Sequence, residues 1–138
     1  MISFEFQVPF NIVPDIKYKQ WLKSIIRKEG LIPGDIFYLF CDDAYLLIQN
    51  QHFLNHDTLT DIITFDHDVD NVVAGDIMIS IDRVVENAQQ FNVSVEKEFL
   101  RVVAHGVLHL CGYKDKSDVD AAVMRIKEEE SIQMFYNS

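Results

Sequence analysis

Three things are scarce in this chain: long apolar runs, cysteine and, through its middle, positive charge. No stretch approaches the roughly 18 consecutive apolar residues that a membrane span needs. The N-terminus lacks the basic start and long apolar run of a signal peptide. The two cysteines, Cys41 and Cys111, are too few for a disulfide framework. We therefore expect a cytoplasmic protein with no membrane partner.

The remaining composition is that of one folded unit. The chain has 138 residues, of which 49% are apolar, and this suffices for a real core. Repeats, low-complexity runs and linkers are absent from the sequence. We expect residues 1–138 to form a single domain, and we favour a monomer.

Charge is unevenly distributed. A net charge of −10 argues against binding nucleic acid, because phosphates attract Lys and Arg. However, Arg83 is the one basic residue between Glu29 and Lys97, so an acidic middle lies between basic flanks. The flanks carry Lys17, Lys19, Lys23, Arg27 and Lys28, then Lys97, Arg101, Lys114, Lys116, Arg125 and Lys127. They form either a local positive surface or merely solvated helix faces.

Apolar periodicity divides the chain into nine elements. Alternating or short apolar runs predict strands at about 2–8, 36–41, 61–66 and 72–81. Helical spacing and capping residues predict helices at about 14–29, 44–53, 82–91, 94–110 and 117–135. Asp42 or Asp43 would cap the second helix, and Ser80 or Asp82 the third. The fold class is α+β, with a mixed sheet of about four strands covered by helices.

Two histidines on one of these helices predict a metal site. His105 and His109 lie four residues apart, so both imidazoles project from one helix face. Gly112 can end the helix in a left-handed conformation, and Asp115 could then return a carboxylate to the same ion. Such a zincin-like set would hold one zinc ion through three ligands and leave a fourth position for water. The alternative is a pair of core histidines without a metal.

The spacing matches the zincin arrangement His-Glu-x-x-His-x-x-Gly-x-x-His in register, with two differences. Gly106 stands where zincins carry the glutamate that acts as general base, so we do not expect the usual peptidase chemistry here. Asp115 stands in place of the third histidine. Cys111 lies within the motif, and we expect it to be a buried thiol.

The whole motif, His-Gly-x-Leu-His-Leu-x-Gly-Tyr, resembles the YbeY family of bacterial endoribonucleases. The segment from Asn50 to Phe65 is similar to the family's Asn-x-x-Tyr-Arg-x-x-Asp-x-Pro-Thr-Asp-Val-Leu-Ser-Phe, and Gly75 to Ser80 reads Gly-Asp-Ile-Met-Ile-Ser. The resemblance implies zinc-dependent, single-strand-specific cleavage of RNA in ribosomal RNA maturation and ribosome quality control. Its partners would be ribosomal RNA, the ribosome, and a ribosomal protein or GTPase. The chain departs from the pattern at Leu54, where the family usually has an Arg.

The predicted chemistry is hydrolysis of a phosphodiester by water at the ion. The second motif makes Asp61 and Asp57 candidates for the general base, although either could instead cap a loop or helix. The residues that we predict to contact substrate are Thr60, Arg101, Lys114 and Lys116. Two other functions stay open. One is a non-catalytic ribosome-associated module whose fold the metal stabilises, and the other is a metallohydrolase that acts on another substrate, including a peptide.

Overall fold

The computed structural model of the chain describes the backbone of residues 1–54 and 60–138 and the side chains of residues 1–52 and 60–138. The element order confirms the predicted α+β fold. The strands are β1 (Ile2–Phe6), β2 (Ile32–Cys41), β3 (Ile62–Asp66) and β4 (Val72–Ser80). The helices are α1 (Ile16–Lys28), α2 (Asp43–Leu54), α3 (Ile81–Gln90), α4 (Val95–Leu110) and α5 (Asp118–Tyr136).

The sheet is mixed, as predicted, with the strand order β1-β2-β4-β3. β1, β2 and β4 are parallel, whereas β3 is antiparallel to β4 and forms an edge. β2 begins at Ile32, four residues before the predicted start at Ile36. The prediction missed these residues because Pro33 and Gly34 usually mark a turn, but a register shift between Pro33 and Ile36 accommodates them in the strand.

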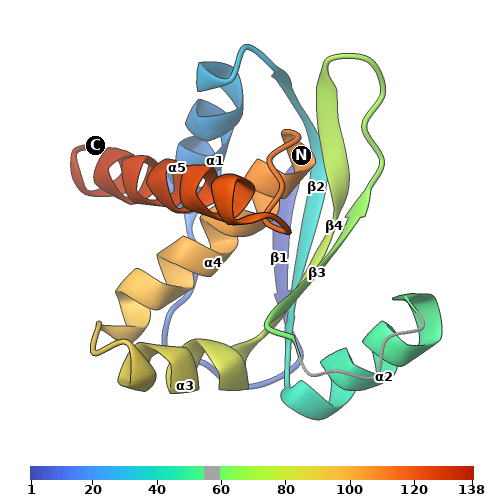
Figure 1. The fold of residues 1–138 in the computed structure, drawn as a ribbon, viewed down its shortest axis with the longest axis vertical. Coiled ribbons are helices and arrows are strands. Elements are labelled where there is room, and N and C mark those ends of the chain that lie inside the picture. Colours follow the sequence, from blue (N-terminus) through green and yellow to red (C-terminus); the bar gives the residue numbers. More distant parts are fainter. Residues whose placement is uncertain (55–59) are drawn as a thin grey trace.

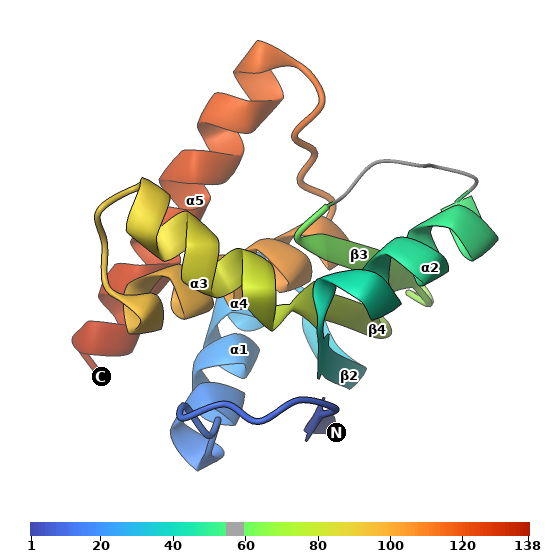
Figure 2. The ribbon, with the colours of Figure 1, turned by 90° about the horizontal axis from the view of Figure 1, so that it is seen from below.

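Helices cover both faces of the sheet. α1 and α4 pack on one face and α2 on the other, as the two views in Figures 1 and 2 show. The larger core lies between the sheet and α1, α4 and α5, and the smaller core beneath α2 contains Cys41, Leu46 and Ile63. α4 is the central helix, because it contacts β3, β4 and the other helices on its face, α1, α3 and α5. Within the described part of the chain, no helix combines the length and apolar character needed to cross a bilayer.

Side-chain caps set where the helices begin. Asp15 caps α1 by accepting a hydrogen bond from the backbone N–H of Lys17, so the helix begins two residues after the predicted start at residue 14. Of the two residues predicted as possible caps for α2, Asp42 is the cap, because it accepts a hydrogen bond from the N–H of Tyr45. Of the two predicted for α3, Ser80 is the cap. Ser94 and Ser117 cap α4 and α5. The cap on α4 fixes the starting point, and hence the face, of the helix that carries both histidines.

Candidate metal centre

The structure brings the three predicted ligands together. His105 and His109 lie one turn apart on α4, and the Nε2 atoms of the two rings lie 3.3 and 3.4 Å from Oδ2 of Asp115. The three ligand atoms all lie within 4.8 Å of one another. Among residues 1–54 and 60–138, this is the one group of His, Cys, Asp and Glu side chains with the geometry to hold a metal ion.

The return of Asp115 to the helix depends on how α4 ends. Gly112 has φ of +108°, a left-handed conformation that favours glycine. The N–H of Gly112 donates to the carbonyl of His109 and that of Tyr113 to the carbonyl of Leu108, which is the hydrogen-bond pattern of a Schellman motif. The chain therefore reverses directly after the second histidine, as the glycine predicted, and carries the carboxylate back toward both imidazoles.

Each imidazole has a hydrogen-bond acceptor at its Nδ1 atom, on the side of the ring away from Asp115. Nδ1 of His105 lies 2.5 Å from Oε2 of Glu128, and Nδ1 of His109 lies 2.9 Å from the backbone carbonyl oxygen of Tyr113. Each Nδ1–H can donate to these oxygens, and each Nε2 then presents its lone pair toward Asp115. An acceptor behind each imidazole is the usual arrangement around metal-ligating histidines. The donor set and its orientation therefore fit a divalent ion such as zinc.

Glu128 is the functional residue that the sequence analysis missed. It lies on α5, and its side chain is 6% exposed. A signal was available in the pattern of α5, because the charged Glu128 falls at helical spacing within an otherwise apolar and small-residue stripe. The buried members of that stripe are Met124, Glu128, Ser131, Ile132 and Phe135. A carboxylate in such a position needs a partner, and His105 together with Arg101 provides it.

Arg101 connects the metal site to its surroundings. Its guanidinium lies 2.7 Å from Glu98, 3.4 Å from Glu128 and 3.5 Å from Asp61. Burial acts against the charge of Arg101, but hydrogen bonding to Glu98 and the nearby carboxylates outweigh it and raise the pKa of Arg101 above its usual value. Arg101 was predicted to contact substrate. In the structure its donors already face three carboxylates, and that prediction stays untested.

The other predicted residues surround the site at different distances from it. Asp61 lies at the start of β3 and reaches the site only through Arg101. Thr60 donates its hydroxyl to the carbonyl oxygen of Ile62, 3.4 Å away, within its own loop. Asp57, the second candidate for the base, lies outside the described residues, as does the side chain of Leu54.

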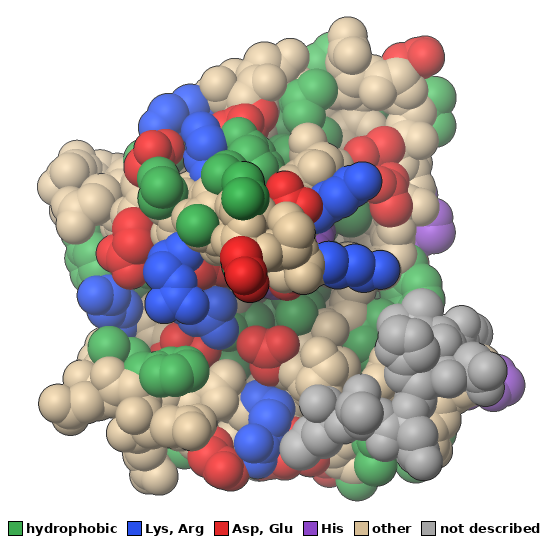
Figure 3. Space-filling view, in the orientation of Figure 1, with side chains coloured by type: hydrophobic (Ala, Val, Ile, Leu, Met, Phe, Trp, Pro, Cys, Tyr) green, Lys and Arg blue, Asp and Glu red, His purple; other side chains and the backbone are tan. Residues whose placement is uncertain are grey.

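Lys114 and Lys116 are both exposed, one on each side of Asp115 in the chain. They belong to one of the basic flanks, which we now locate on the surface. Figure 3 shows that, on the face carrying α4 and α5, basic side chains alternate with acidic ones. Lys28 and Lys127, for example, form ion pairs with Glu130 and Glu29. This pattern favours solvated helix faces over a continuous positive surface.

Close packing of α4 against the sheet explains why residue 106 is a glycine. A Cβ at this position would lie 2.9 Å from Cγ2 of Ile77 and 3.1 Å from Cδ1 of Ile62, so it faces the sheet and not the histidines. The zincin base therefore has no equivalent here, as the sequence indicated. Cys111 is half-buried instead of fully buried, because the chain turns outward at the end of α4. Its burial still raises the pKa of its thiol to about 12.

The fold and this site together define the class of protein: a metal-dependent hydrolase whose candidate ligands lie on and just after a buried helix. A family model described as "Endoribonuclease YbeY" matches residues 7–136. The chain belongs to this family, as the histidine motif predicted.

Similar proteins support this assignment along the whole chain. "Endoribonuclease YbeY" of Flavobacterium johnsoniae is 52% identical over 136 residues, which cover 99% of this chain and 98% of the relative. The protein of the same name from Flavobacterium psychrophilum is also 52% identical, over 99% of this chain and 97% of its own length. The solution structure of TM1509 from Thermotoga maritima matches with a TM-score of 0.64 and 29% identity, and covers 99% of this chain and 90% of that one.

Proposed function

We propose that this protein is a zinc-dependent endoribonuclease that cleaves single-stranded RNA during ribosomal RNA maturation. One observation carries the proposal: two imidazoles and a carboxylate converge, and both imidazoles are oriented by acceptors behind them. Relatives at 52% identity that bear the name endoribonuclease point to RNA as the substrate. We place this action in the cytoplasm, where the ribosome assembles.

His105, His109 and Asp115 would hold one zinc ion per chain. When bound, such an ion acidifies water and polarises a phosphoryl oxygen. The protein's own contribution is to orient the ligands, through Glu128 on α5 and the carbonyl of Tyr113 in the loop after α4. Three protein ligands are typical of catalytic zinc sites, and structural sites usually have four.

Asp61 is the residue that we propose as the proton acceptor. Its side chain is 29% exposed and lies 3.5 Å from the guanidinium of Arg101, which holds the carboxylate in position. Thr60 lies next to it and would contact substrate through its hydroxyl. Lys114 and Lys116 flank Asp115 on the outside, where they would attract the phosphates of an incoming strand.

A digest of defined RNA tests the proposal. Zinc-loaded protein should cleave a single-stranded RNA and leave its duplex form intact, and both a chelator and His105→Ala should abolish the cleavage. His67→Ala is the matched control, because His67 is an exposed histidine on the β3–β4 side, paired with Asp76. Cleavage that survives in His105→Ala would reveal a contaminating nuclease. Bound metal with intact RNA would favour the non-catalytic module.

A further inference from the structure

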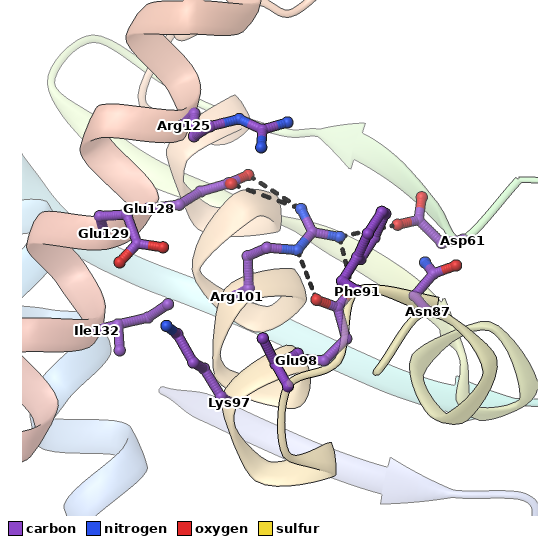
Figure 4. Close-up of a pocket in the computed structure, with 11 residues that line it drawn as sticks. Asp61, Asn87, Phe91, Lys97, Glu98, Arg101, Arg125, Glu128, Glu129 and Ile132 are labelled. Atoms are coloured by element: carbon purple, nitrogen blue, oxygen red, sulfur yellow. Dashed lines mark hydrogen bonds and ion pairs between the residues drawn. The ribbon is translucent and has the colours of Figure 1, made fainter. Parts of the chain in front are cut away.

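A cavity of about 370 Å³ opens beside the metal centre, between α3, α4 and α5. Glu128, which holds His105, forms part of its wall. In Figure 4, Asn87, Phe91 and Asp61 lie on one side of the cavity, residues of α5 lie on the other, and Arg101 lies between them. The volume falls within the range of small-ligand sites, about 300–1,000 Å³. The cavity is thus large enough for a small ligand, and the side chain of Glu128 lies between it and His105.

Phe91 is an exposed aromatic residue in the wall of the cavity. It caps the C-terminus of α3 and is 58% exposed, although burying a ring of this size would be favourable. No aromatic ring in the described part of the chain stacks against it. Asn87 lies one helical turn earlier on the same side of α3 and offers both a donor and an acceptor to the cavity. An exposed ring beside an amide can stack on a base and bind its edge.

The charges around the cavity are of two kinds. Glu98, Glu128 and Asp61 all lie within ion-pair distance of Arg101, so three carboxylates share one guanidinium. Lys97 and Arg125, in contrast, form no ion pair with any residue that the structure describes. With Glu129, the lining holds four carboxylates and three cations, so Lys97 and Arg125 are local positive groups in a cavity without net positive charge. Lys97 and Arg125 are the groups at this rim that can bind a phosphate.

The position of the cavity along α4 relates it to the metal site. Lys97, Arg101, His105 and His109 recur at intervals of four residues, and all four are half-buried on one face of the helix. One such interval corresponds to about 6 Å of helix. A group bound near Arg101 is therefore about one helical turn from the first metal ligand.

We propose that this cavity binds one unpaired nucleotide of the RNA strand, next to the phosphodiester that is cleaved. Phe91 stacks on the base, Asn87 hydrogen-bonds to its edge, and Arg125 with Lys97 binds a phosphate. The proposal rests on the proposed function and adds a binding site to it. It also accounts for a preference for single strands, because a base in a duplex is already stacked and paired and cannot enter the cavity.

Binding of a fluorescent single-stranded oligoribonucleotide, measured by anisotropy, tests this. The oligonucleotide is 2′-O-methylated, and a gel checks that it stays intact with zinc-loaded protein. Phe91→Ala should weaken binding about tenfold, and Phe91→Tyr, which keeps the ring, should restore it. Arg125→Ala should weaken binding several-fold and reduce the salt dependence by about one phosphate contact. Ile126→Ala is the matched control, because Ile126 is exposed on α5 and does not line this cavity.

The outcomes separate this proposal from the function on which it rests. If Phe91→Ala and Arg125→Ala bind the oligonucleotide as tightly as the unaltered protein does, the nucleotide site is wrong, whereas chelator-sensitive cleavage by the unaltered protein would leave the endoribonuclease function standing. If the unaltered protein neither binds nor cleaves RNA, both proposals fail. A separate titration with 5′-AMP distinguishes a free nucleotide. Loss of AMP binding but not of RNA binding in Phe91→Ala would overturn RNA as the occupant.

Discussion

Oε2 of Glu128 lies 2.5 Å from Nδ1 of His105, so a residue of α5 orients a metal ligand on α4. Glu128→Gln keeps the size of the side chain but removes its charge, and we expect zinc affinity to fall about 10–100-fold. Competition with a chromophoric chelator measures this without reference to activity. Glu129→Gln, one residue along and exposed, should bind zinc as the unaltered protein does. Equal affinities for the two variants would show that Glu128 does not support the site.

Asp115 provides the negative charge in the ligand set. We expect Asp115→Ala to lose most of its zinc, because only two ligands remain. Asp115→His should retain zinc, and because the site gains one unit of positive charge, water at the ion should become more acidic. The acidic limb of the pH–rate profile should then move to lower pH. Metal analysis together with rates across pH measures both effects, and a retained, unshifted profile in Asp115→His would contradict the electrostatic argument.

Arg101 is expected to contribute strongly to stability. Arg101→Ala leaves Glu98, which is 2% exposed, without its cation. Stranding a buried charge costs about 3–5 kcal/mol, so urea should unfold the variant at a clearly lower concentration. Lys97→Ala removes a cation one turn earlier that has no such partner, and we expect a change within about 0.5 kcal/mol. A similar small change for both variants would mean that Glu98 becomes protonated or hydrated when it loses its partner.

Gly106 allows α4 to approach the sheet closely. Gly106→Ala would bring a methyl group within 2.9 Å of Ile77, and overpacking of this kind costs about 1–3 kcal/mol. The better helix propensity of alanine offsets at most about 1 kcal/mol of this. We therefore expect a net loss of stability in denaturant unfolding, together with weaker zinc binding because the adjacent His105 moves with the helix. An increase in stability would mean that Ile77 and Ile62 adjust freely.

Cys41 should make folding sensitive to alkaline pH. Burial, followed by the nearby Asp42 and Asp43, raises the pKa of its thiol from 9.0 to about 12. Above pH 9 the unfolded chain loses this proton while the folded chain keeps it. The stabilisation is therefore complete below pH 9 and declines as the pH rises toward 12. Urea midpoints at pH 8 and 10.5 should show a fall, and Cys41→Ala should show a smaller one. The same fall in both proteins would assign the effect to other groups.

The fold could be predicted closely because its signals are local. Helical spacing, the capping serines and Gly112 each act over a few residues, and the predicted and observed elements correspond. The convergence of the three candidate ligands was also within reach, because they lie within eleven residues of one chain segment. β2 was predicted too short because Pro33 pairs with Val73 of β4 and Gly34 lies in the register shift that follows, and local propensity contains neither feature.

The support of the metal site could not be predicted in the same way. Glu128 is one of three consecutive glutamates, and although helical spacing places it on the buried face of α5, its contact with His105 depends on the crossing of α5 over α4. The nucleotide cavity has the same origin. Phe91, Arg101 and Arg125 come from three helices, and their juxtaposition depends on how those helices pack.

The anchoring of both imidazoles by Glu128 and Tyr113 implies a preorganised receptor. Holding a side chain in one rotamer costs about 0.5–1.5 kcal/mol. Because folding already fixes both imidazoles, metal binding does not have to order them. Ion affinity and fold stability therefore depend on the same contacts. The hydroxyl of Tyr113 donates to Glu29 at the end of α1, which extends this coupling to a third helix. Mutations far from the histidines that fray α1 or α5 should thus weaken metal uptake while leaving every ligand in place.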